Sequence, residues 1–295
     1  RGAGRALAVE LGRAGATVYV TGRTTRERAS EVGRTTETIE ETGELVTAAG
    51  GVGIAVPTDH LDEERVRALF GRIEAEHGRL DVLVNDLWGG EHLTAGSIFG
   101  KKSWETPLAD GLRILELGVR SHVITAALGL PLLVRSDGPL LVEVTDGTAE
   151  YNRRYRENLY YDLAKNAPIR MAFGLGEELA EYGGAAVCVT PGFLRSEQML
   201  AHFGATEQNW RDVTAVEPTF AIAESPHYLA RGVAALAADP RRAERWNRKS
   251  TSSAELAQVY GLTDVDGSRP DAWAYFAALE ERGEQGAPVS AEDYR

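Results

Sequence analysis

The sequence reads GPLLVEVTD at residues 138–146, YDLAK at residues 161–165 and AAVCVT at residues 185–190. The first and third stretches are apolar runs with the length of buried strands, and a helical pattern between them begins at Tyr161 and reaches Tyr182. Strand, helix and strand in this order are typical of parallel sheets whose faces are covered by helices. We therefore expect an α/β fold with a doubly wound parallel sheet.

Tyr161 and Lys165 are the two reactive side chains of that helix. Residues four apart share one helix face, so the phenol and the ammonium group are expected to lie together. A nearby cation favours the phenolate and lowers a tyrosine pKa from its ordinary value of about 10. The pair predicts a proton donor and acceptor at Tyr161, with a pKa that Lys165 lowers.

Gly2 and Gly4 lead into the first helical run, which we expect over residues 5–14. Closely spaced glycines at a helix start let backbone N–H groups approach a phosphate, and the helix dipole favours its negative charge. The pattern is typical of half a βαβ unit in a Rossmann-type fold. Only the last two glycines of such a loop are present, and a glycine-rich helix cap is the alternative explanation.

Arg23 and Thr24 follow the next predicted strand, residues 17–20. In a dinucleotide-binding fold the end of this strand reads the adenosine ribose, where a carboxylate binds a 2′-hydroxyl and an arginine suits a 2′-phosphate. Arg1, directly before Gly2, offers a second cation. These residues predict NADP(H) as the cofactor.

The rest of the chain alternates strand and helix patterns without a repeat or a second domain, so we expect one domain over residues 1–295. Residues 193–223 have scattered aromatics and little periodicity, and we expect a substrate lid there rather than a plain loop, because ligands of open parallel sheets bind beyond the carboxyl ends of the strands. Residues 254–295 read as a C-terminal extension. The other predicted elements are helices at 37–49, around 66–73, at 109–134, 225–238 and 271–281, and strands at 53–57, 80–85 and 246–253.

The net charge of -12 argues against nucleic-acid and anionic-membrane partners, because phosphates are repelled by such a surface. The single cysteine, Cys188, lies in an apolar run, which predicts a buried thiol and a reducing, cytoplasmic compartment. The longest apolar stretch, residues 123–134, is shorter than a membrane span. Lysine makes up four of the 32 basic residues, a bias typical of a G+C-rich bacterial genome. The six histidines have no metal-ligand spacing, so we expect no metal site.

Together these residues resemble the short-chain dehydrogenase/reductase family from Arg1 to about Gly267. The Tyr-x-x-x-Lys motif is intact, the glycine loop resembles residues 1–4, and the family's adenine-contacting Asp matches Asp59. Its Asn-Asn-Ala-Gly signature corresponds to residues 85–88, where only Asn85 is retained, and its Pro-Gly turn beside the nicotinamide matches Pro191 and Gly192. The resemblance implies a further strand, preceding Arg1, in the middle of the sheet. Residues 104–107 (WETP) and 264–267 (DVDG) are similar to the subgroup around the animal dehydrogenase/reductase family member one.

This chain departs from the family at two positions. The family's substrate-orienting Ser corresponds to Asp146 when counted from the strand and to Thr148 when counted back from Tyr161. Thr148 can donate a hydrogen bond as Ser does, whereas Asp146 can donate only when protonated, because an ionised carboxylate repels an oxyanion. The family's helix Asn, which supports a proton-relay water, aligns with Glu116.

The resemblance implies hydride transfer between NADP(H) and a ketone or secondary alcohol, with Tyr161 as acid and base and with Lys165 on the nicotinamide ribose. Two alternatives stay open: nucleotide binding without redox turnover, and dehydration or epimerisation with Glu116 or Asp146 as base. Apolar helix faces suit a homodimer or homotetramer. The expected cofactor residues are Arg1, Gly2, Gly4, Arg23, Thr24, Asp59, His60, Asn85, Lys165, Pro191, Gly192 and Phe193. An apolar substrate pocket is expected from Leu87, Trp88, Tyr155, Met199, Leu200 and Phe203.

Overall fold

The computed structural model describes residues 1–283 and 289–295; residues 284–288 of the expected C-terminal extension lie outside the described residues. Its α-helices are α1 (Gly2–Arg13), α2 (Ile39–Ala48), α3 (Glu63–His77), α4 (Glu91–Leu93), α5 (Leu108–Leu115), α6 (Ser121–Leu133), α7 (Leu159–Leu179), α8 (Glu197–His202), α9 (Pro226–Ala238), α10 (Arg242–Trp246), α11 (Ser253–Tyr260) and α12 (Ala272–Gly283). Its strands are β1 (Thr17–Gly22), β2 (Val52–Pro57), β3 (Val82–Asn85), β4 (Leu140–Val144), β5 (Ala185–Thr190) and β6 (Ser250–Ser252).

All strand pairs are parallel, as the alternating pattern predicts. β1 pairs with β2, and a second sheet has the order β3-β4-β5-β6. A cavity lies between β1 and β3, because residues of both strands line it.

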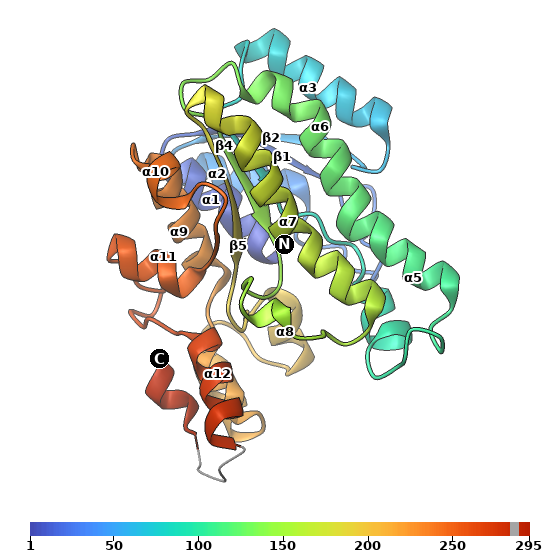
Figure 1. Cartoon of the computed structure of the whole chain (residues 1–295), viewed down its shortest axis with the longest axis vertical. Coiled ribbons are helices and arrows are strands. Elements are labelled where there is room, and N and C mark those ends of the chain that lie inside the picture. The colour runs from blue at the N-terminus through green and yellow to red at the C-terminus, as the bar shows by residue number, and fades with distance from the viewer. Residues whose placement is uncertain (284–288) are drawn as a thin grey trace.

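Helices cover both faces of the four-stranded sheet (Figure 1). On β4, Leu140 and Val142 pack against α1, α9 and α11, while Leu141 between them packs toward α3, α6 and α7. Residues 140–143 of β4 and all of β5 are buried between these two layers, which explains why these two strands read as mainly apolar runs. The fold is the expected doubly wound α/β sheet.

The long helix predicted over residues 109–134 is interrupted. A π-helical turn, η2 (Glu116–Arg120), separates α5 from α6. Gly118 lies in this turn, and a Cβ atom there would come within 2.8 Å of the Trp88 ring and 3.2 Å of Ala164. The missing side chain lets the turn pack against both, an effect of tertiary contact that helical periodicity does not reveal.

The last predicted strand, residues 246–253, is wrong at its start. Trp246 ends helix α10, and its indole N–H donates to the hydroxyl of Tyr260 at 2.8 Å. Only Ser250–Ser252 pair with β5. The apolar character of Trp246 reflects burial against the core, and not membership of the sheet.

Residues 193–223 form α8 and two 3-10 helices, η5 (Trp210–Ala215) and η6 (Pro218–Ile222). They enclose a small core of their own, which contains Leu200, Trp210 and Phe220. Arg195 is fully buried and joins this segment to the C-terminal extension through Asp264, at 3.0 Å. Figure 1 shows α8 and α12 at the same end of the molecule, below β5.

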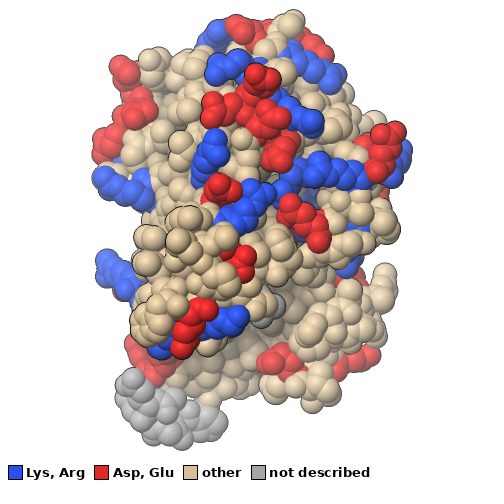
Figure 2. Space-filling view, turned by 90° about the vertical axis from the view of Figure 1, so that its right-hand side faces the viewer, with Lys and Arg blue, Asp and Glu red and all other residues tan. Residues whose placement is uncertain are grey.

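Acidic and basic side chains are intermixed on the face shown in Figure 2. Within residues 1–283 and 289–295, no helix combines the length and the apolar composition that crossing a membrane requires. Cys188 is buried as expected, and burial raises the pKa of its thiol well above the ordinary value.

Candidate active site

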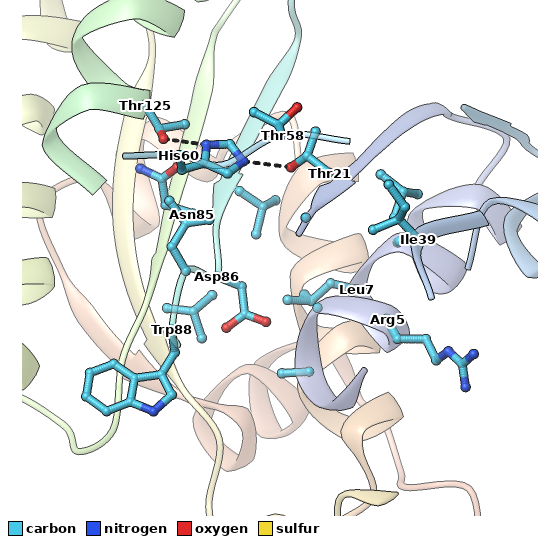
Figure 3. A pocket seen from close by; sticks show the side chains of 18 of the residues that line it. Arg5, Leu7, Thr21, Ile39, Thr58, His60, Asn85, Asp86, Trp88 and Thr125 are labelled. Carbon is cyan, nitrogen blue, oxygen red and sulfur yellow. Dashed lines mark hydrogen bonds between the residues drawn. The ribbon is translucent and has the colours of Figure 1, made fainter. Parts of the chain in front are cut away.

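A cavity of about 1030 Å³ runs along the whole length of β1 and β3, passes their carboxyl ends and reaches α7. Its wall contains most of the residues expected to bind the cofactor: Arg1, Gly2, Gly4, Arg23, Thr24, Asp59, His60, Asn85, Lys165 and Pro191. Figure 3 shows several of the side chains that line it. Gly192 and Phe193 continue the chain beyond Pro191 outside this wall.

The N-terminus of α1 holds a carboxylate. Gly2 has φ +55°, a left-handed conformation that favours glycine, and its N–H donates to Glu197 Oε2 at 2.7 Å. Arg1 pairs with Glu91 at 3.0 Å. Glu197 lies on α8, so residues 193–223 reach the position at which the sequence analysis expects a phosphate, and a bound phosphate has to displace this carboxylate.

Arg23 directly follows β1, and its guanidinium reaches the loop after β3, where a Cβ atom on Gly89 would meet Arg23 Nη2. Its guanidinium contacts both carboxylate oxygens of Glu31, at 2.7 and 3.2 Å. Glu31 belongs to the loop between β1 and α2, which the sequence analysis did not consider. The cation expected to bind a 2′-phosphate is thus already paired within its own loop.

His60 joins two elements in the cavity wall (Figure 3). Its ring nitrogens contact Thr21 Oγ1 at 2.9 Å and Thr125 Oγ1 at 2.7 Å. Burial lowers the pKa of His60 to about 4, so the imidazole is neutral at pH 7. Asp59 beside it accepts the N–H of Leu61, at 3.0 Å.

Asn85 and the loop after it are held by a buried polar network. Asn85 Nδ2 donates to Glu143 Oε1 at 2.9 Å, and the other carboxylate oxygen of Glu143 contacts His122 Nδ1 at 2.5 Å. His122 Nε2 donates to the Leu87 carbonyl at 2.9 Å. This network fixes the loop in place. The sequence analysis did not predict it, although a glutamate inside an otherwise apolar strand, as at Glu143, indicates a buried polar partner.

Asp86 and Trp88 stand where the family has Asn and Gly, and both face the cavity (Figure 3). Asp86 is half-buried close to Gly4, and desolvation raises its pKa. The ammonium nitrogen of Lys165 lies 3.5 Å from the centroid of the Trp88 ring, a cation–π contact. Burial lowers the pKa of Lys165, while the charges of Asp146 and Asp86 oppose that shift.

Tyr161 begins the first turn of α7, whose N-cap is Asn158; the Asn158 side chain accepts the N–H groups of Tyr160 and Tyr161. Its hydroxyl donates to Asp146 Oδ2 at 2.6 Å. Burial and the Asp146 carboxylate raise the pKa of Tyr161 above its ordinary value. This corrects the expectation that Lys165 lowers that pKa, because the nearby charges that act on the phenol are Asp146, Arg156 and Glu157.

Thr148 and Glu116 are not brought to the phenol. Thr148 Oγ1 accepts the N–H of Tyr151 at 3.1 Å, which makes it part of a turn. Glu116 is half-exposed and pairs with Arg113 at 2.8 Å, so it does not take the place of the family's helix Asn beside Lys165. Of the two positions that counting allowed for the family Ser, the structure brings Asp146 to Tyr161.

The expected substrate residues divide into two groups. Trp88 packs edge-on to Tyr161, with 6.0 Å between ring centroids, and Phe99, which the sequence analysis did not name, does so at 5.1 Å. Tyr155 is exposed, while Met199 and Phe203 pack into the core of the 193–223 segment. Leu200 is buried in the same core, so these three residues shape the segment rather than contact the phenol.

The Pro191 turn contacts the C-terminal extension. Trp273 on α12 donates its indole N–H to the Pro191 carbonyl at 3.0 Å. A Cβ atom on Gly192 would come within 2.8 Å of Ala272 and 2.9 Å of Glu224 Oε2, so only glycine fits there. Phe193 packs edge-on to Phe220, at 5.6 Å between centroids.

Several residues that line the cavity suit a nucleotide. They include a helix N-terminus led by two glycines, Arg23 and Lys165, and the buried Asn85 Oδ1 has no hydrogen-bond partner among the described residues. In the same described ranges, no group of three or more His, Cys, Asp or Glu side chains is placed to hold a metal ion.

This fold and site define a class of oxidoreductase built on a dinucleotide-binding sheet, with a Tyr-x-x-x-Lys helix beside it. Comparison with known proteins agrees: residues 1–208 match the short chain dehydrogenase family model. A mouse protein, dehydrogenase/reductase SDR family member 1, is 33% identical over 270 residues, which cover 90% of this chain and 81% of that protein. The chain belongs to the short-chain dehydrogenase family, and it is similar to the expected subgroup.

Two solved structures carry cofactors. A metagenomic short-chain oxidoreductase in complex with NADP is 19% identical with a TM-score of 0.61, over 85% of this chain and 90% of that one. A 7α-hydroxysteroid dehydrogenase, complexed with NADH and 7-oxo glycochenodeoxycholic acid, is 19% identical with a TM-score of 0.65, over 91% of each chain. These likenesses show the fold, and the family's cofactor is a nicotinamide dinucleotide of either kind.

Proposed function

We propose that this oxidoreductase interconverts a secondary alcohol and a ketone with NADP(H). The observation that carries the proposal is that Lys165 lines the cavity one helical turn from Tyr161, whose phenol contacts Asp146. Arg23, which follows β1 and lines the same cavity, supports a cofactor with a 2′-phosphate. The buried thiol of Cys188 suits a cytoplasmic location.

One group of residues binds the cofactor, and Tyr161 transfers the proton. The nicotinamide ring supplies the hydride donor and acceptor when bound. Gly2, Gly4 and Arg23 hold the phosphates, and Lys165 holds the ribose next to the ring. Tyr161 exchanges the proton with the substrate oxygen, and the rings of Trp88 and Phe99 beside it favour an apolar substrate.

Nucleotide binding without redox turnover is the second candidate. The cation–π contact between Lys165 and the Trp88 ring favours this candidate, because a cofactor ribose has to compete with the ring for the ammonium group. If the protein only binds the nucleotide, the cofactor stays unreacted with every ketone, whereas an oxidoreductase consumes it.

The first measurement is the binding of NADPH and of NADH, monitored by nicotinamide fluorescence. The second is the consumption of each cofactor in the presence of a panel of apolar ketones. Tyr161→Phe is expected to lower turnover by about 10²-fold or more with an unchanged fold, since it removes the proton donor. Circular dichroism and NADPH affinity are the controls for folding. Equal turnover in the variant contradicts the role of Tyr161, and binding without turnover on any ketone favours the second candidate.

A further inference from the structure

Asp146 lies at the centre of a polar cluster beside Tyr161. Its Oδ2 atom accepts the Tyr161 hydroxyl at 2.6 Å and Arg156 Nη2 at 2.9 Å. Asn152 Oδ1 accepts a second N–H of Arg156 at 2.6 Å, and Asn152 Nδ2 donates to the Asp146 carbonyl at 3.0 Å. Gly147 has φ +102°, and a Cβ atom there would come within 2.0 Å of Asn152 Oδ1. The turn is therefore built around this cluster.

The direction of the hydrogen bond follows from the charges. Arg156 has only donors, so the Asp146 Oδ2 atom that it contacts at 2.9 Å is an acceptor. The proton in the 2.6 Å contact is then the phenol's own. Because the Tyr161 hydroxyl donates its proton to Asp146, the phenol oxygen is free to accept a hydrogen bond from a ligand, and a substrate hydroxyl is a suitable donor.

We propose that Asp146 is a catalytic residue, the terminal proton acceptor of a relay through Tyr161, and that Arg156 is the positioning residue that holds Asp146 for this role. The proposal rests on the alcohol–ketone function above and deepens it. It assigns a use to the carboxylate that stands where the family has a Ser.

The step balances in both directions. A bound oxidised nicotinamide would accept the hydride from the carbinol C–H bond, and the alcohol O–H proton moves to the Tyr161 oxygen. The Tyr161 proton moves at the same time to Asp146 Oδ2, and the substrate becomes a ketone. The Asp146 side chain is 40% exposed, so its new proton exchanges with solvent. Ketone reduction runs the same relay in reverse and starts from protonated Asp146.

The relay predicts opposite pH dependences for the two directions, because oxidation needs ionised Asp146 and reduction needs it protonated. The titratable and charged groups that face this pair are Tyr161 and Lys165 on α7, and Arg156 and Glu157 on the loop before it.

The experiment measures alcohol oxidation and ketone reduction against pH for the wild type, Asp146→Asn, Arg156→Gln and Arg156→Lys. Asp146→Asn is expected to lower oxidation at neutral pH by about 10²-fold and to move the acidic limb of the profile to higher pH, because activity then recovers only as Tyr161 ionises. Arg156→Gln changes the profile in the same sense, and Arg156→Lys restores part of it. Arg153→Gln is the matched control, because Arg153 is exposed on the same loop and pairs only with Glu150 in the described structure.

A second readout needs no turnover. In the ligand-free protein, Asp146→Asn is expected to lower the pKa of Tyr161, because it removes the negative charge that raises it. The ionisation is followed by tyrosinate absorbance as the difference between each protein and its Tyr161→Phe partner. An unchanged Tyr161 titration, or a wild-type profile in an active Asp146→Asn enzyme, overturns the relay alone. No turnover in the wild type with any alcohol or ketone overturns the proposed function and the relay with it.

Discussion

Arg23 and Glu31 show how one residue's role depends on its neighbour. Arginine at the end of β1 suits a 2′-phosphate, but both oxygens of Glu31 already contact its guanidinium. A 2′-phosphate has to displace this carboxylate and is repelled by it. Glu31 therefore weakens the preference that Arg23 alone predicts.

We expect Glu31→Gln to tighten NADPH binding by about 10-fold and to leave NADH affinity within about 2-fold, since only NADPH carries the competing phosphate. Fluorescence titration of both cofactors measures the ratio. Glu27→Gln is the matched control, because Glu27 is an exposed carboxylate of the same loop. An equal gain for both cofactors would show that Glu31 does not act on the 2′-phosphate.

His60 makes the free energy of unfolding depend on pH in the acidic range. Its folded pKa of about 4 lies below the ordinary value of 6.5, so below pH 6.5 the unfolded chain takes up a proton that the folded chain refuses. Stability is then lost as the pH falls from 6.5 toward 4, by about 2–3 kcal/mol between pH 7 and pH 4.5. Chemical denaturation at the two pH values should show this loss in the wild type and not in His60→Gln. The exposed His202→Gln serves as control, and a loss of the same size in His60→Gln would exclude His60 as its source.

At the scale of elements, the 193–223 segment depends on a buried carboxylic acid where it meets β5 and α11. Glu224 is buried, and its Oε2 accepts the Ser253 hydroxyl at 2.6 Å. Burial raises the pKa of Glu224 to about 8, with Asp264 adding to the shift, while Ser253, Gly192 and Arg195 oppose it. The acid is therefore protonated at pH 7.

Because the folded pKa of Glu224 lies above its unfolded value of 4.5, stability falls as the pH rises from 4.5 to 8. Glu224→Gln keeps the shape and removes the ionisation, so we expect its stability relative to the wild type to increase by about 2 kcal/mol between pH 6 and pH 8. Denaturant titrations at both values measure the difference. Glu178→Gln, at an exposed site on α7, is expected to give no such change, and a constant difference for Glu224→Gln would contradict the prediction.

Individual elements show what the sequence predicts and what it leaves out. The strands β4 and β5 were predictable because they are buried on both faces and read as continuous apolar runs. The π-helical turn at 116–120 was not, because it depends on Gly118 packing against Trp88 from a distant loop. In the site, spacing along one helix placed Lys165 near Tyr161, but only the folded loop shows that Arg156 and Asp146 govern the phenol.

At the scale of the whole molecule, α5 and α7 lie side by side on one face of the fold (Figure 1), and close enough that a Cβ atom on Gly111 would come within 2.5 Å of the Tyr160 ring. Both carry exposed apolar side chains, with Leu108 63%, Leu112 50%, Leu159 45%, Leu163 46% and Phe173 41% exposed. Apolar side chains gathered on neighbouring helices mark an interaction surface more often than scattered ones do. The homo-oligomer expected from the sequence has its most suitable contact here.

We expect the wild type to form a dimer through this α5–α7 face, and Leu112→Asp with Leu163→Asp to weaken the dimer by about 100-fold or more, since each charge would be buried in a symmetric contact. Sedimentation equilibrium over a range of protein concentrations measures the dissociation constant. Val259→Asp is the matched control, because Val259 is 49% exposed on α11, outside this face. The double variant should keep its fold and its NADPH affinity, because neither leucine lines the cofactor cavity. A monomeric wild type, or a dimer that the double variant does not weaken, would show that these leucines do not form a contact between copies of the chain.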